Sequence, residues 1–168
     1  PIRDRGSLAF WWRTDRTYRS GAGAPKFSEK LIEVTGTCTV VFQADANALT
    51  LMVQWQGRRE EVAERHIRVI LPEFPGPAWH HVAVTYDGRG GATAADGLTL
   101  YLDGVAVPVY RDTNAAYVAM ENLAEPLVIG HEAPGWRQLQ GGLDEVRLWS
   151  VARTASQIQA ALTTELTG

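Results

Sequence analysis

The sequence predicts an all-β fold, an antiparallel sandwich or barrel with one short helix near the C-terminal end. Apolar and polar residues alternate with a period of two along most of the chain, as in half-buried strands. About ten such runs are separated by turn residues, which is typical of sandwiches and barrels. Helical spacing occurs only near the end. The length of 168 residues predicts a single domain over residues 1–168.

The predicted strands follow from this alternation. SLAFWWRT (7–14) places Leu8, Phe10 and Trp12 on one face. The runs that follow it in the chain are TCTVVFQA (37–44), ALTLMVQW (48–55), RHIRVIL (65–71), WHHVAVTYDG (79–88), LTLYLDGVAVPVY (98–110), PLVIGHE (126–132) and GLDEVRLWSV (142–151). The run at 98–110 predicts a hairpin, because Asp103-Gly104 supplies the residues that a type I′ turn prefers.

The helix is predicted over residues 154–163. Thr154 is a suitable N-cap with Gln157 three residues later, which is the capping-box pattern. Ile158 and Leu162 recur at helical spacing, so the helix should pack one apolar side on the sheets. Small residues in GRGGATAADG (88–97) predict a loop.

The composition excludes several classes of protein. Hydrophobic residues make up 45% and charged residues 21%, so the chain can form a globular core. The net charge of −3 without a basic run argues against nucleic-acid binding. No apolar run approaches the roughly 18 residues that span a bilayer, so no membrane insertion is expected. The single cysteine, Cys38, excludes an internal disulfide, and its alternating surroundings favour a buried thiol over a reactive one.

Five segments together carry a family resemblance. SLAFWWRTD, WHHVAVTYDG, LTLYLDGVAV, LVIGHE and GGLDEVRLWSVARTASQI occur in this order between residues 7 and 162. They resemble the laminin-G-like, concanavalin-A-like lectin/glucanase jelly-roll family, and in particular its bacterial modules. The stretch from Gly141 to Ile158 is the most specific.

The resemblance implies a two-sheet antiparallel jelly roll with a concave and a convex face. It also implies a module that binds and does not catalyse, in an extracellular or cell-surface protein. Only six residues precede Ser7, where family members commonly carry another strand, and ELTG (165–168) looks like a lead-in to more chain. We therefore expect a domain excised from a larger protein, with other domains of the same chain as partners.

GGLDEVRLWS (141–150) contains three charged residues within a predicted strand. Alternation places Asp144 on the side of Val146 and Leu148, and Glu145 with Arg147 on the other side. A carboxylate beside core residues needs hydrogen-bond donors or a cation. We expect Asp144 to hold neighbouring structure by hydrogen bonds, with metal ligation and catalysis as alternatives, and Glu145 and Arg147 to form a surface ion pair.

An enzyme is not expected. Glucanases that share the jelly roll carry an E-x-D-x-E pattern, whose alternate carboxylates meet on one strand face. Leu143, Glu145 and Arg147 occupy the corresponding spacing here. A glucanase-like glycoside hydrolase is therefore the least favoured of the three functions considered.

No cofactor is certain, and calcium is the candidate. Glu132 matches one acidic position in the ligand loop of related calcium-binding jelly rolls, but Ala133 and Pro134 stand where further ligands would be expected. A single calcium site, at Glu132 or around Asp45 and Asn47, is the less favoured alternative to a domain without metal; calcium takes carboxylate and carbonyl oxygens from loops. His81 matches the usual histidine of the family, which implies a structural role.

Tryptophans mark the predicted ligand site. Trp136 lies in the loop EAPGWRQ beside Arg137, where a ring can stack on a sugar and a polar side chain can read hydroxyls. The alternative is a Trp136 folded back over the sandwich edge. Trp55, at a strand end, is a second candidate. Trp12 and Trp79 match structural aromatics of the family and are expected in the core.

These observations predict a noncatalytic, lectin-like carbohydrate-binding module. The site would comprise Trp136, Arg137, Glu132 and Trp55. The alternative is a structural or protein–protein interaction module that binds no glycan. A jelly roll supports many functions, so the order of the two rests on the resemblance and on the loop aromatics.

Overall fold

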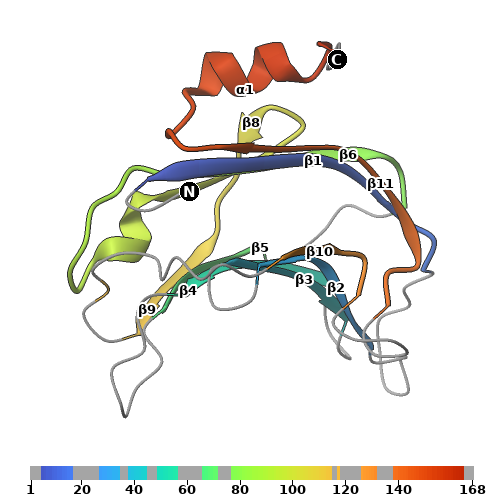
Figure 1. Cartoon of the computed structure of the whole chain (residues 1–168), viewed down its shortest axis with the longest axis horizontal. Coiled ribbons are helices and arrows are strands. Elements are labelled where there is room, and N and C mark those ends of the chain that lie inside the picture. The colour runs from blue at the N-terminus through green and yellow to red at the C-terminus, as the bar shows by residue number, and fades with distance from the viewer. Residues whose placement is uncertain are drawn as a thin grey trace.

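The computed structural model describes residues 5–16, 27–34, 38–44, 49–56, 66–71, 77–114, 117, 126–131 and 138–164. Two antiparallel sheets form stacked layers, and one helix lies on the outer side of one sheet (Figure 1). The alternation left a sandwich and a barrel open; the structure is a sandwich, and the two-sheet antiparallel fold that the resemblance implied is confirmed. Among the described residues, no helix has the length and apolar character to cross a bilayer.

The first sheet has five strands. Their order is β11 (Gly141–Trp149), β1 (Gly6–Thr14), β6 (His80–Tyr86), β7 (Leu98–Leu102) and β8 (Val105–Ala106). The N-terminal strand β1 therefore pairs with the C-terminal strand β11 on one side and with β6 on the other. This pairing brings together three segments that are far apart in the sequence.

The second sheet has six strands. Their order is β10 (Leu127–Ile129), β2 (Phe27–Val34), β3 (Cys38–Ala44), β4 (Leu49–Gln56), β5 (His66–Leu71) and β9 (Tyr110–Asn114). The sequence analysis did not identify β2 or β9. Three of the eight residues of β2 are charged, and its register shifts between Lys30 and Ile32, so the period of two is interrupted.

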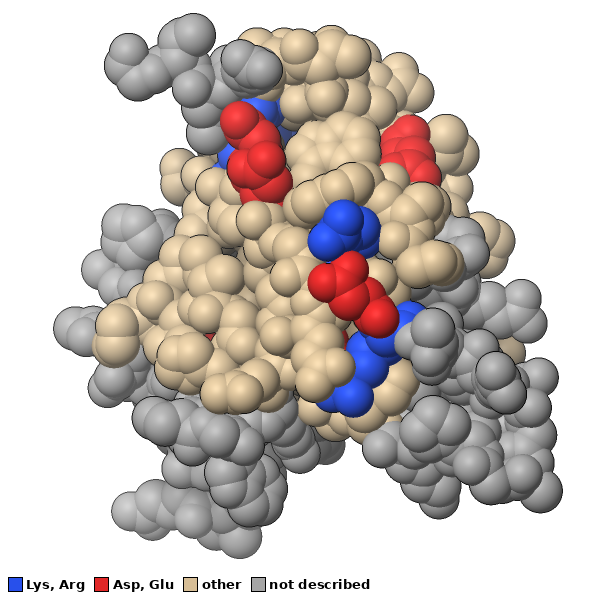
Figure 2. Space-filling model, turned by 90° about the vertical axis from the view of Figure 1, so that its right-hand side faces the viewer, with Lys and Arg blue, Asp and Glu red and all other residues tan. Residues whose placement is uncertain are grey.

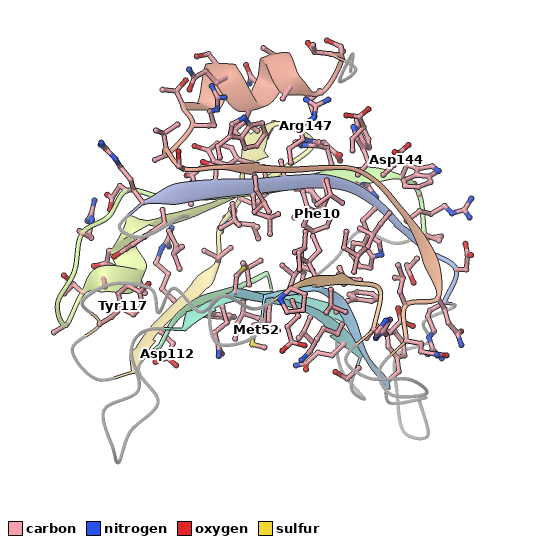
Figure 3. All side chains as sticks on the ribbon, in the orientation of Figure 1. Phe10, Met52, Asp112, Tyr117, Asp144 and Arg147 are labelled. Carbon is pink, nitrogen blue, oxygen red and sulfur yellow. The ribbon has the colours of Figure 1, made fainter. Side chains whose placement is uncertain are left out.

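The core fills the space between the sheets. Phe10 and Trp12 of β1 are fully buried, and the Trp12 ring meets Phe42 of β3 edge-on at a centroid distance of 4.4 Å. Figure 3 shows Phe10 pointing between the layers, whereas Met52 points away from the five-stranded sheet. Cys38 is buried in this core, and burial raises the pKa of its thiol to about 12, as expected for an unreactive cysteine.

The helix α1 (Ala155–Ala161) covers part of the outer face of the five-stranded sheet. The predicted capping box is present: the Gln157 N–H donates to Thr154 Oγ1, and the Thr154 N–H donates to Gln157 Oε1. Ile158 is fully buried against Ala9, Ala83 and Tyr101 of the sheet. The prediction of one helix packed on a sheet is confirmed.

Two of the predicted connections, the turn at residues 103–104 and the loop at residues 88–97, can be compared with the structure. Asp103 and Gly104 both have positive φ, 50° and 79°, so the predicted turn between β7 and β8 is confirmed. The loop expected at 88–97 contains the short 3₁₀ helix η1 (Ala94–Gly97). Ala94 and Ala95 are buried there, so part of that segment belongs to the core.

Candidate functional site: a pocket on the outer face of the five-stranded sheet

A β-bulge interrupts β11 where it crosses β1. Ala9 pairs with Arg147, whereas Trp11 pairs with Asp144, so Glu145 and Val146 lie opposite the single residue Phe10. Glu145 has a φ of 51°, in the left-handed region that non-glycine residues rarely adopt. The bulge changes which side chains of β11 face outward.

The predicted orientation of Asp144 was wrong. Val146 packs against the core, whereas Asp144 is exposed, although alternation placed the two on one side. The extra residue of the bulge shifts the alternation by one position between them. Asp144 Oδ1 accepts a hydrogen bond of 2.8 Å from the Glu145 N–H, within the bulge itself. Its predicted role of holding neighbouring structure stays a prediction.

Arg147 connects the sheet to the chain beyond the helix. Its Nε and Nη2 donate to Glu145 Oε2 at 3.1 and 2.6 Å, and its Nη1 donates to the Ala161 carbonyl at 3.0 Å. Nη2 also donates to the Thr164 carbonyl. The expected ion pair with Glu145 is present. However, Arg147 is only 8% exposed, so this is not the surface pair that was predicted.

Two tryptophans stand beside these charges. Trp11 of β1 is half-buried and meets the buried His81 ring edge-on, with centroids 5.4 Å apart. Trp79, which was expected in the core, is 43% exposed. Its ring lies against Gly142, where an added Cβ would be 2.6 Å from Trp79 Cη2, and the Arg13 guanidinium lies 5.4 Å from its centroid. The missing side chain at Gly142 thus leaves space for the ring.

These residues line a cavity of about 410 Å³. The volume is toward the lower end of the roughly 300–1,000 Å³ typical of small-molecule sites. We call this cavity the outer pocket; its lining residues are Trp11, Trp79, Asp144, Glu145, Arg147, Leu162, Thr163 and Thr164. Acidic and basic side chains gather on this side of the molecule (Figure 2). Figure 3 shows Asp144 and Arg147 on the helix side of the sheet, pointing away from the core.

His81 lies beneath the outer pocket. It is 2% exposed, and its backbone N–H donates to Asp103 Oδ1 at 2.8 Å. Desolvation lowers the pKa of His81, and the charge of Arg147 lowers it further, while Asp103 acts in the opposite direction. The neighbouring His80 faces Asp103 Oδ2 from its Nδ1 at 2.8 Å. These contacts support the structural role of His81, which stays a prediction.

The outer pocket can bind a small polar ligand. The indole rings offer apolar surface for stacking, and the carboxylates of Asp144 and Glu145 offer hydrogen-bond acceptors. Neither Trp11 nor Glu145 was predicted as a site residue. The pair Trp11-Trp12 did carry a signal, because consecutive residues of a strand face opposite sides and one of them had to point outward.

Of the ligand-binding and calcium residues predicted from the sequence, none has a side chain that the structure describes. Glu132, Trp136 and Arg137, like Asp45 and Asn47, lie outside the described residues. The backbone of Trp55 lies in β4, paired with Cys38, but its side chain is not described. In the described part of the chain, no three His, Cys, Asp or Glu side chains are grouped to hold a metal ion. A calcium site therefore stays a prediction.

Comparison with known proteins adds a family and a set of similar folds. A protein-family model for the concanavalin A-like lectin/glucanases superfamily matches residues 3–159. No curated protein matches the sequence.

Solved structures resemble the chain at low sequence identity. Domain 4 of AbnA, a GH43 extracellular arabinanase from Geobacillus stearothermophilus solved in complex with arabinotriose, is 16% identical with a TM-score of 0.55. The match covers 96% of this chain and 68% of that one. The binding domain of Paraclostridial Mosquitocidal Protein 1 is 13% identical with a TM-score of 0.52. The match covers 94% of this chain and 36% of that one. The binding domain of botulinum neurotoxin serotype G is 11% identical with a TM-score of 0.55. The match covers 95% of this chain and 36% of that one. At these identities the likeness concerns the fold.

Proposed function

We propose a carbohydrate-binding function because the chain belongs to the concanavalin A-like lectin/glucanase superfamily. The chain would act as a noncatalytic, lectin-like module of a larger extracellular or surface protein. The observation that carries this proposal is the outer pocket, in which two indole rings stand beside two carboxylates.

Sugar recognition uses this combination of side chains. A pyranose or furanose ring has an apolar C–H face that packs on an aromatic ring, while its hydroxyls need hydrogen-bond partners. Trp79 is 43% exposed, so part of its indole ring is accessible for a sugar to stack on. The small cavity suits one or two sugar units better than a long chain laid across the sheet.

A protein-interaction module is the second candidate, and a specific observation favours it. The edge strands β10 and β11 expose apolar side chains: Leu127 is 41% exposed, Ile129 44% and Leu148 45%. Edge strands with exposed apolar residues are suited to contact another polypeptide. This function would use the edge of the sandwich and not the outer pocket.

A glycan array of the chain tests the first proposal. The array should be probed with wild type, with Trp79→Ala and with Tyr110→Ala, which removes a 69% exposed aromatic from the other sheet. We expect Trp79→Ala to weaken binding at least about tenfold, as for a central aromatic contact, and Tyr110→Ala to change it little. Circular dichroism and thermal melts would confirm that both variants fold.

Two further conditions separate the remaining site predictions. A Trp136→Ala variant tests the loop site, and a chelator tests whether calcium at Glu132, or around Asp45 and Asn47, takes part in binding. Binding that falls with Trp136→Ala and not with Trp79→Ala would move the site to the loop. Silence of wild type with calcium and with chelator would reject the carbohydrate function in favour of the interaction module.

A further inference from the structure

We infer that the outer pocket selects glycans that carry a protonated amino group over neutral and acidic glycans. This inference rests on the proposed carbohydrate-binding function and names the ligand class of the same pocket. It follows from the hydrogen bonds and ion pairs that the charged side chains of the pocket already make within the protein. Three charged side chains line it, two of them acidic and one basic: Asp144, Glu145 and Arg147.

The basic side chain is occupied by the protein itself. Arg147 makes two hydrogen bonds to Glu145 and one to each of the carbonyls of Ala161 and Thr164. Four of its five N–H donors are therefore used within the fold, and the side chain is 8% exposed. The charge of Glu145 is balanced by the same guanidinium. Arg147 is consequently a poor partner for the carboxylate of an acidic sugar.

The carboxylate of Asp144 is the charge that remains open. Asp144 is exposed, and its Oδ1 accepts the Glu145 N–H. Among the described residues, its Oδ2 has no hydrogen-bond or ion-pair partner. Arg13, whose guanidinium lies over Trp79, is itself paired with Asp15 at 3.1 Å. Among the residues that the structure describes, the pocket lining therefore has one negative charge without an ion-pair partner.

An ammonium group suits this arrangement on two grounds. It would pair with Asp144 and donate hydrogen bonds to its free oxygen. Trp79 already has the Arg13 guanidinium 5.4 Å from its ring centroid, so the Trp11 indole is the ring that would attract the ammonium group through its quadrupole. An acidic sugar would meet like charge without a compensating donor, which costs affinity. A neutral sugar would gain stacking and hydroxyl hydrogen bonds to the carboxylates, but no ion pair.

Isothermal titration of the whole chain with three matched ligands tests the inference. The probes are the β-1,4-linked disaccharides of glucosamine, glucose and glucuronic acid. We expect the glucosamine ligand to bind about tenfold more tightly than the glucose ligand at low salt, and the glucuronic acid ligand to bind more weakly than both. Raising the salt concentration should reduce the preference, because the pocket is open to solvent.

A charge-neutralising variant locates the effect. Asp144→Asn keeps an oxygen that can accept the Glu145 N–H but removes the charge, and it should abolish the tenfold preference by weakening glucosamine binding far more than glucose binding. Asp96→Asn is the matched control: it makes the same change of net charge at an exposed position in η1 that does not line the pocket, and it should leave the preference intact.

The outcomes separate the two proposals. If the three disaccharides bind equally, if the acidic one binds best, or if Asp144→Asn leaves the preference unchanged, the charge selection is overturned and the carbohydrate function stands. If no disaccharide binds and the glycan array is also silent, the carbohydrate function fails together with this inference.

Discussion

The outer face of the five-stranded sheet has two ends that differ in character. At one end, α1 closes over Ala9, Ala83 and Tyr101, and Ile158 is fully buried among them. At the other end, β1 and β11 present Trp11 and Asp144 to the outer pocket, and the Trp11 ring packs on the buried His81 of β6. A single face of one sheet thus carries both an apolar helix contact and the outer pocket with its charged side chains.

The helix length accounts for this difference. The α1 helix has seven residues and ends at Ala161, so at about 1.5 Å per residue it spans only part of the sheet. Beyond it, Arg147 holds the carbonyls of Ala161 and Thr164. The bulge in β11 lies at the border of the two ends and turns Asp144 toward the uncovered one. A short helix therefore leaves room for a site on a face that a longer helix would cover.

The largest expected effect comes from removing the helix contact at the end of the face that α1 covers. Ile158→Ala removes the buried contact of α1, and we expect a loss of about 2–5 kcal/mol in the free energy of unfolding. Urea denaturation measures the loss. Ser156→Ala, at an exposed position of the same helix, should change the free energy by less than about 0.5 kcal/mol. Equal effects of the two variants would show that the helix does not close this end through Ile158.

A smaller effect is expected at the end that contains the outer pocket, where Gly142 lies against Trp79. Gly142→Ala places a Cβ 2.6 Å from Trp79 Cη2, so the ring must move. We expect a cost of about 1–3 kcal/mol in urea denaturation and a loss of glycan binding, although no polar group is altered. The double variant with Trp79→Ala should be no less stable than Trp79→Ala alone, because the clash is absent. A further loss in the double variant would place the role of Gly142 elsewhere.

The smallest expected effect concerns His81, which is buried against Trp11 beneath the outer pocket. Its pKa is lowered below the ordinary 6.5, so the unfolded chain binds the proton more readily. The stability that the neutral ring contributes is therefore present above pH 6.5 and is lost as the pH falls below it. Each unit of pKa difference corresponds to about 1.4 kcal/mol.

The measurement is a pair of denaturation curves at pH 7.5 and pH 5. His81→Gln, which stays neutral, should lose less stability than wild type between these two values. The comparison with the variant is needed because the pH dependence of wild type sums the contributions of every ionisable group in the chain. The same pH dependence in both proteins would contradict the lowered pKa.

Much of the fold could be read from local patterns. The alternation in SLAFWWRT predicted β1, and the Asp103-Gly104 pair predicted the turn between β7 and β8. Thr154 with Gln157 predicted the start of α1. Each of these signals depends on residues close together in the chain. Charged β2 was missed because its pattern becomes clear only when β3 and β10 pair with it.

The candidate site could be predicted far less well. Trp79 was expected in the core and Asp144 on the core side, and both line the outer pocket. The residues expected to bind the ligand, Trp136 and Arg137, were chosen from loop composition and lie outside the described residues. Alternation assumes an uninterrupted strand, and it fails at a bulge, whose position is defined by the partner strand.

The sequence by itself determined the class of fold, the single C-terminal helix and the identity of the core residues in β1, because burial of a periodic apolar face is a local property of a strand or helix. Only the tertiary structure decided where the charges of β11 point. That outcome depends on the register between β1 and β11, which are about 130 residues apart in the chain, and on where α1 ends above them. Long-range pairing and the extent of the helix, which no local pattern encodes, created the outer pocket.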